Sequence, residues 1–136
     1  MAGAGYDRPA VPSDFDVVRW WFDAFNRRDL DALLALAHPE ISFSPLQVHG
    51  TDVLYGHDGV KAVWARMEDV GLDHRIAITA LYTLEDGRTA AVGVVEPGDV
   101  DFVGLYRIED GLVREGQNRF AGDDTLRRLG IADAGD

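Results

Sequence analysis

The chain has 136 residues, the size of one domain, and 46% of them are hydrophobic, which is enough for a sizeable core. Its 24 acidic and 13 basic residues give a net charge of −11, which disfavours binding to nucleic acid or to an anionic membrane surface. Because the chain has no cysteine, disulfides, thiolate nucleophiles and cysteine-ligated metals are excluded. We expect a cytoplasmic protein, since the sequence lacks a secretory signal and a membrane-spanning apolar run.

The first half of the chain predicts helices. Residues 1–12 are rich in Gly, Ala and Pro and are expected to form a flexible arm before a single domain over residues 13–136. Ser13 is a candidate N-cap for a helix that runs to about Arg28, and Asp29 for a second helix that ends before Pro39. Asp58 is a candidate cap for a third helix, with Gly71 as its stop. The apolar faces of the first and third helices are Val18, Trp21, Phe22 and Phe25, and Val60, Val63, Trp64 and Met67.

The second half predicts strands. After a short strand at 41–45, β-rich runs occupy 74–84, 89–96, 100–108 and 112–121, separated by the turn sequences EDG, EPGD and EDG. A last short helix is expected from Asp123 or Asp124 to Leu129. The pattern predicts an α+β fold in which three N-terminal helices pack on one face of a curved antiparallel sheet and leave a cup. Because some strands are apolar on both faces, we expect a homodimer that covers the outer face of the sheet.

Four motifs occur in a characteristic order. WFDAFNRRDLDALLALAHPEISF is followed by YGHDGVKAVWARM, by YRIEDGLVREGQNRF and by DTLRRLGI. This order resembles the SnoaL-like branch of the NTF2-like superfamily, which includes ketosteroid isomerase-like and polyketide cyclase-like proteins. The resemblance implies a cone-shaped fold, a homodimer, and an apolar ligand such as a steroid, a polyketide intermediate or a terpenoid epoxide.

The catalytic residues of these relatives do not carry over. In ketosteroid isomerases the resemblance implies a tyrosine donor at the position of Trp21, a general-base aspartate at Pro45 and an aspartic acid near Gly104. Neither proline nor glycine can move a proton. The epoxide hydrolase pattern is absent as well, because the meander has no Arg-x-Asp and Asn118 and Ala121 stand near where its last acid would lie. The resemblance therefore leaves open whether the protein is an enzyme.

A set of largely aromatic residues is predicted to bind the ligand. If the strand register holds, the residues facing the cup are Trp21, Phe25, Phe43, Trp64, Met67, Phe102, Gly104, Tyr106, Gly116, Asn118 and Phe120, with Tyr55 at the mouth. These side chains either line a cavity or fill the core. Gly104 and Gly116 remove side-chain volume from adjacent strands and favour a cavity, although a bulge would explain them equally well.

Three residues are candidates for catalysis. Asn118 is a buried amide that needs a partner, either a ligand carbonyl or hydroxyl or a neighbouring backbone group. Glu96 faces the cup if Val92 and Val94 do, in which case desolvation suits it to proton transfer; otherwise it is solvated at a hairpin. His57 lies beside the loop over the predicted mouth and could act as an acid or base.

We expect no metal and no cofactor, because the histidine spacing matches no ligand motif. The sequence favours a protein that binds a small apolar molecule, either as a binder or as a cofactor-independent isomerase or cyclase of secondary metabolism. The alternative is a non-catalytic dimeric accessory or protein-interaction domain whose cup is filled by its own side chains. The space beside Gly104 and Gly116 and the partner of Asn118 distinguish the two.

Overall fold

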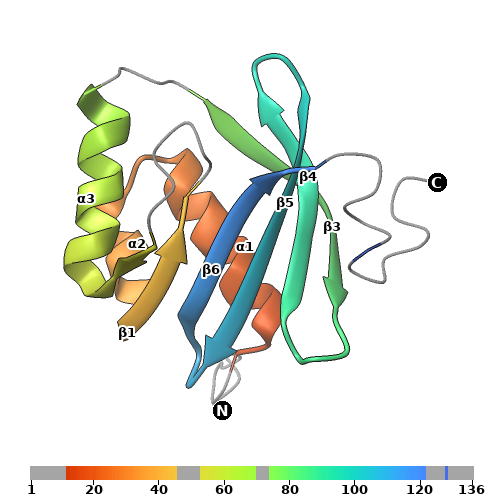
Figure 1. The fold of residues 1–136 in the computed structure, drawn as a ribbon, viewed down its shortest axis with the longest axis horizontal. Coiled ribbons are helices and arrows are strands. Elements are labelled where there is room, and N and C mark those ends of the chain that lie inside the picture. Colours follow the sequence, from red (N-terminus) through yellow and green to blue (C-terminus); the bar gives the residue numbers. More distant parts are fainter. Residues whose placement is uncertain (1–11, 46–52, 70–73, 122–127, 129–136) are drawn as a thin grey trace, which may run out of the picture.

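The computed structural model of the chain describes residues 12–45, 53–69, 74–121 and 128. Its elements are α1 (Asp14–Asn26), α2 (Leu30–Leu36), β1 (Ala37–Ser44), β2 (Leu54–Tyr55), α3 (Gly56–Asp69), β3 (Arg75–Thr83), β4 (Thr89–Glu96), β5 (Val100–Glu109) and β6 (Leu112–Phe120) (Figure 1). The predicted N-terminal arm, except Pro12, and the predicted last helix, except Arg128, lie outside the described residues. None of the helices in the described ranges combines the length and the hydropathy needed to cross a membrane.

The strands form one sheet in the order β2-β1-β6-β5-β4-β3. Strands β3 to β6 make the predicted antiparallel meander. β1 instead runs parallel to β6, so the expectation of a wholly antiparallel sheet is wrong at this strand. The chain reaches β1 from α2 and not through a hairpin, so no tight turn forces the two strands to be antiparallel. The helices lie on one face of the sheet, with α1 crossing behind it and α3 beside β1 (Figure 1).

The predicted N-caps of the first two helices are confirmed. The Ser13 hydroxyl accepts the backbone N–H of Asp16 at 3.1 Å, and the Asp29 carboxylate accepts that of Ala32 at 3.0 Å. These acceptors satisfy N–H groups that a helix start leaves without an intrahelical partner. The Asp29 cap holds the α2 side of the turn between the two helices, and backbone bonds from Arg28 and Asp29 to Phe25 and Ala24 hold its α1 side, which matters for Arg28 within it.

Three element boundaries differ from the predicted ones. α1 ends at Asn26 and not at Arg28, because Arg28 has a φ of 58°, in the left-handed region. α3 begins at Gly56, so Asp58 lies in its first turn and is not its cap. β1 begins at Ala37, before the predicted start, and the pairing with β6 is irregular between Ala37 and Ser42.

The core has two parts, one on each face of the sheet. The larger part fills the space between the helices and the inner face, and it includes Ala91 and Val95 of β4. The smaller part, on the outer face, contains Ala90, Val103 and Leu105, which are all buried within a single chain. A second subunit is therefore not needed to bury these three residues, and the homodimer stays a prediction.

Candidate functional site

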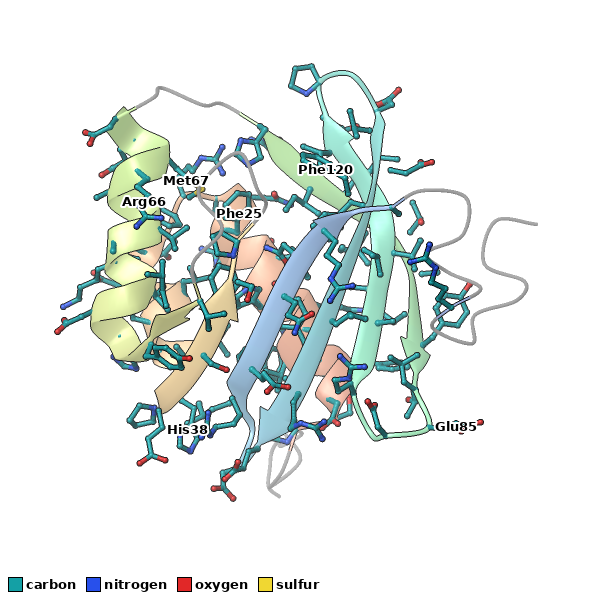
Figure 2. The ribbon with its side chains drawn as sticks, viewed as in Figure 1. Phe25, His38, Arg66, Met67, Glu85 and Phe120 are labelled. Atoms are coloured by element: carbon teal, nitrogen blue, oxygen red, sulfur yellow. The ribbon has the colours of Figure 1, made fainter. Side chains whose placement is uncertain are left out.

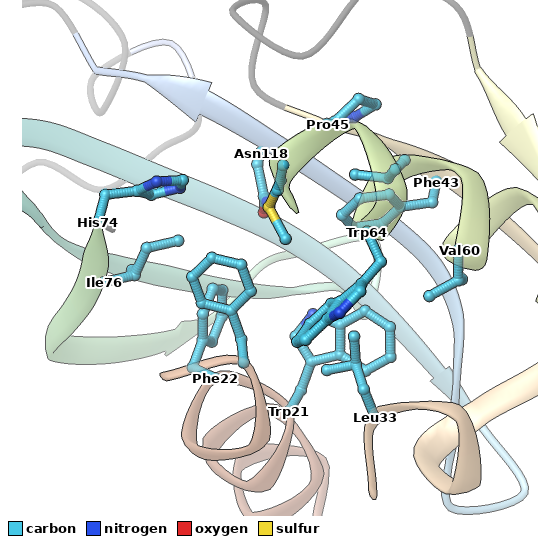
Figure 3. A pocket seen from close by; sticks show the side chains of 13 residues that line it. Trp21, Phe22, Leu33, Phe43, Pro45, Val60, Trp64, His74, Ile76 and Asn118 are labelled. Atoms are coloured by element: carbon cyan, nitrogen blue, oxygen red, sulfur yellow. The ribbon is translucent and has the colours of Figure 1, made fainter. Parts of the chain in front are cut away.

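A cavity lies between the three helices and the inner face of the sheet. Its volume is about 40 Å³. The lining residues are Trp21, Phe22, Phe25, Leu33, Phe43, Pro45, Val60, Val63, Trp64, Met67, His74, Ile76 and Asn118. Figure 3 shows Asn118, His74 and Pro45 on one side of this space and Trp21 and Leu33 on the other. The lining is thus aromatic and aliphatic, with its polar side chains gathered at one side.

Part of the predicted cup lines this cavity. Of the predicted ligand-binding residues, those that line it are Trp21, Phe25, Phe43, Trp64 and Met67, and Asn118 joins them from the catalytic candidates. Phe22, Val60 and Val63 could have been added, because they share helix faces with predicted members. His74, the residue just before β3, was not singled out because nothing in its sequence neighbours marks its orientation.

The two glycines beside the cup accommodate the ring of Tyr106. A Cβ atom at Gly104 would lie 2.7 Å from one edge carbon of this ring, and a Cβ at Gly116 would lie 2.9 Å from another. The prediction that these glycines leave space for a ligand is therefore wrong, because Tyr106 occupies that space. Tyr106 and Phe102 are buried and pack against Phe22, with ring centroids 5.4 and 5.7 Å apart.

The hydroxyl of Tyr106 fixes the orientation of Asn118. It donates to the Asn118 Oδ1 atom at 2.6 Å. Burial raises the pKa of Tyr106 well above its usual value. The phenol therefore remains a donor at neutral pH. Among the described residues the Asn118 Nδ2 group has no hydrogen-bond partner, so its N–H groups are free to bond a molecule in the cavity.

Glu96 does not face the cavity. It is exposed and lies on the same side of β4 as Ala90 and Val92, which pack in the outer cluster. Strand β4 pairs with β5 without a bulge, so the alternation of its side chains holds along its length. Val92 and Val94 therefore do not face inward, and Glu96 does not face inward either.

His57 also lies away from the cavity lining. Its Nε2 atom is 2.9 Å from the backbone oxygen of Ala37, which makes this nitrogen the protonated donor. The bond ties the start of α3 to the start of β1. The structure thus gives His57 a position in which it supports the fold.

The remaining predicted residues lie outside the cavity as well. Tyr55 is 70% exposed on the edge strand β2 and does not reach the lining. Phe120 is on the inner face, since it pairs with Phe102, but it is 41% exposed at the end of β6 (Figure 2).

One group of side chains has the composition of a metal site. Ligand atoms of His38, Glu109 and Asp110 lie within 4.8 Å of one another. The His38 Nδ1 atom, however, accepts the backbone N–H of Glu40 at 3.0 Å and is therefore unprotonated. A metal on the other ring nitrogen would require the imidazole to lose its last proton. The group lies far from Phe25 and Met67 of the cavity (Figure 2), and we assign it no metal.

Comparisons with known proteins agree with this architecture. A family model described as a SnoaL-like domain matches residues 18–116. An NTF2-like protein from Burkholderia pseudomallei K96243 has a TM-score of 0.65 at 22% identity, over 85% of this chain and 96% of that one. TerC, co-crystallised with polyporic acid, has a TM-score of 0.68 at 21% identity, over 85% of this chain and 96% of that one. A protein named polyketide cyclase from Xanthomonas campestris pv. campestris has a TM-score of 0.63 at 18% identity, over 88% of this chain and 96% of that one.

No curated protein matches the chain at the sequence level. The structural likenesses are too distant in sequence to show more than the fold. They confirm the predicted NTF2-like architecture, and the family model confirms the resemblance drawn from the four motifs.

Proposed function

The chain belongs to the SnoaL-like family, and from this premise we propose that it binds a small apolar molecule of the polyketide, steroid or terpenoid type. The observation that carries the proposal is an aromatic cavity that is also lined by one side-chain amide. This amide belongs to Asn118, and a hydrogen bond from Tyr106 orients it. Apolar rings of the ligand pack against Trp21, Phe43 and Trp64. A ligand carbonyl or hydroxyl accepts from the Asn118 Nδ2 group. TerC, which has a similar fold, was co-crystallised with the small molecule polyporic acid, and this supports the proposal.

The ligand enters by displacing side chains. A cavity of 40 Å³ is smaller than the roughly 150 Å³ that holds a benzene ring in an engineered protein core. Met67 is the side chain best suited to move, because its unbranched chain has three rotatable bonds and adapts to irregular space. A ligand that fills the enlarged space gains apolar burial at about 25 cal/mol for each Å² removed from water.

Turnover, where it occurs, is an isomerisation or a cyclisation that needs no cofactor. Among the described residues that line the cavity, His74 is the one titratable side chain, and it lies on the same side as Asn118. In this reaction His74 moves a proton while Asn118 holds the carbonyl oxygen. The apolar walls contribute by holding the reacting atoms of a flexible substrate together.

A fluorescence titration tests the binding proposal. N-phenyl-1-naphthylamine, a neutral dye that becomes bright in apolar surroundings, should bind in a saturable manner. Val63→Phe, which puts a larger side chain into the cavity, should weaken binding about tenfold or more. Val53→Phe is the matched control, because Val53 is exposed and does not line the cavity. Equal affinity of the two variants, or no saturable binding to the native chain, would contradict the proposal.

A second candidate is the accessory domain with a filled cup, which the packing of Tyr106 between Gly104 and Gly116 favours. We propose for both candidates a homodimer through the outer sheet face, where half-buried Tyr82, Leu84 and Val92 surround the outer cluster. Light scattering of the native chain should give twice the chain mass. Val92→Lys should give the chain mass, whereas Val53→Lys should not. A native monomer would contradict the proposed dimer and leave the proposal for the cavity unaffected.

A further inference from the structure

A second depression lies on the other side of two cavity residues. It is a surface groove of about 210 Å³ lined by Arg28, Trp64, Met67 and Glu68. Trp64 and Met67 also line the inner cavity. A single layer of side chains therefore separates the two spaces, and Met67 in that layer is flexible. Figure 2 places Met67 beside Phe25, where α3 faces α1.

Contacts of its side chain position Arg28 at this groove. Its φ of 58° lies in the left-handed region, which a side chain with a Cβ atom disfavours. The guanidinium lies 4.7 Å from the centroid of the Phe25 ring. It donates to the backbone oxygen of Phe25 at 3.0 Å and to that of His74. These contacts place a fixed positive charge over the rim formed by two cavity residues.

The charge of Arg28 has no carboxylate partner among the described residues, and no described ion pair includes it. Its neighbour Arg27, by contrast, pairs with Asp23 at 2.9 Å and with Asp29 at 3.2 Å. A guanidinium has five N–H groups, and the two carbonyl bonds of Arg28 leave three for another acceptor. Glu68 shares the groove, but its carboxylate is exposed and forms no ion pair with Arg28.

We propose that the cavity and the groove are two parts of one binding site, and that its ligand is an apolar molecule carrying a carboxylate. The apolar body fills the cavity, Met67 moves aside, and the carboxylate bonds the free N–H groups of Arg28. Because the chain carries a net charge of −11, an anionic ligand needs such a local cation to offset the general repulsion. This inference rests on the proposed function, since it names the class of ligand for the same cavity.

The test is a displacement experiment with two ligands of equal chain length. Decanoate and decan-1-ol are each used to displace N-phenyl-1-naphthylamine from the native protein, from Arg28→Gln and from Arg27→Gln. The native protein should prefer decanoate. Arg28→Gln should weaken decanoate about tenfold and leave decan-1-ol unchanged. Arg27→Gln, whose lost charge lies one residue away but outside the groove, should change neither.

A second variant tests whether a loss of binding comes from the missing charge or from a change in the backbone at residue 28. Arg28→Gly removes the charge while its backbone readily adopts the left-handed φ, and it should repeat the selective loss of decanoate. Equal losses for decanoate and decan-1-ol in the Arg28 variants, or an equal loss of decanoate in Arg27→Gln, would overturn the inference and leave the cavity intact. Failure of the dye to bind the native protein would overturn both this inference and the proposed function.

Discussion

Tyr106 and Asn118 decide how polar the cavity is. The phenol is buried between two glycines, so its hydroxyl can reach only a few partners, and the Asn118 Oδ1 atom is one at 2.6 Å. The bond from Tyr106 uses one lone pair of the Asn118 oxygen and orients the amide, whose Nδ2 group offers its donors to the cavity. The ligand that we propose therefore carries an acceptor, such as a carbonyl, at this place.

Tyr106→Phe removes that hydroxyl and leaves the Asn118 oxygen without its donor. We expect the free energy of unfolding to fall by about 1 to 3 kcal/mol, the usual cost of a buried group losing its partner. Urea unfolding measures this value. Tyr82→Phe is the control, because Tyr82 is half-buried on the outer face, and its effect should stay within about 0.5 kcal/mol. Similar values for both variants would show that the hydroxyl of Tyr106 adds nothing.

The same phenol gives a pH dependence with a definite sign. The pKa of Tyr106 is raised in the folded chain, whereas an unfolded tyrosine titrates near about 10. Below that pH both states keep the proton and the contribution to stability is complete. Above it the unfolded chain loses the proton first, so stability falls as the pH rises toward the folded pKa. The stability difference between native protein and Tyr106→Phe should therefore shrink between about pH 9 and pH 11; a constant difference would contradict this.

At the residue scale the sequence predicted the helix side of the site better than the strand side. Trp21, Phe25, Trp64 and Met67 follow the spacing of helix faces, which depends on local sequence alone. The error at Gly104 has a different origin. Whether an absent side chain leaves a cavity or makes room for a neighbour depends on where the Tyr106 ring lies, and that follows from packing across strands.

At the scale of elements, Asn26 joins α1 to β3. Its Nδ2 group donates to the Ile76 oxygen at 2.8 Å, and its Oδ1 atom accepts the Ile76 N–H at 2.9 Å. The amide thus pairs with the edge strand as another strand would. Ile76 and Phe25, the neighbour of Asn26, both line the cavity, so Asn26 connects two of its walls.

Asn26→Leu keeps the size of the side chain and removes both bonds to Ile76. We expect a loss of about 1 to 3 kcal/mol in the free energy of unfolding, because the Ile76 oxygen and N–H then lack their partners. Hydrogen exchange of the Ile76 amide should also accelerate, since its N–H has lost its acceptor. Asp23→Asn on the exposed side of α1 is the control and should cost less than about 1 kcal/mol. Unchanged exchange at Ile76 would contradict the role given to Asn26.

The elements themselves were largely predictable, and their faces and partners were less so. Periodicity and the acidic and hydroxyl caps gave the helices, and the Asp-Gly turns gave the meander. The parallel pairing of β1 with β6 joins segments far apart in the chain, which no local pattern encodes. The face of Glu96 stayed open because β4 is apolar on both sides, so alternation could not fix which face is inside.

At the scale of the whole molecule, the central claim is that the cavity binds a small apolar molecule. The tryptophans of the chain can serve as probes of this claim. The chain has three tryptophans. Trp21 and Trp64 line the cavity, whereas Trp20 is 43% exposed on another face of α1. A ligand in the cavity must therefore affect two indoles and spare the third.

The most direct measurement is an NMR titration of the ¹⁵N-labelled chain with N-phenyl-1-naphthylamine, in which each indole N–H gives one signal. The signals of Trp21 and Trp64 and the side-chain amide of Asn118 should shift together and saturate at one affinity, while that of Trp20 stays in place. Shifts confined to Trp20, or no saturable shift at Trp21 and Trp64, would mean that the cavity is only the interior of a filled fold.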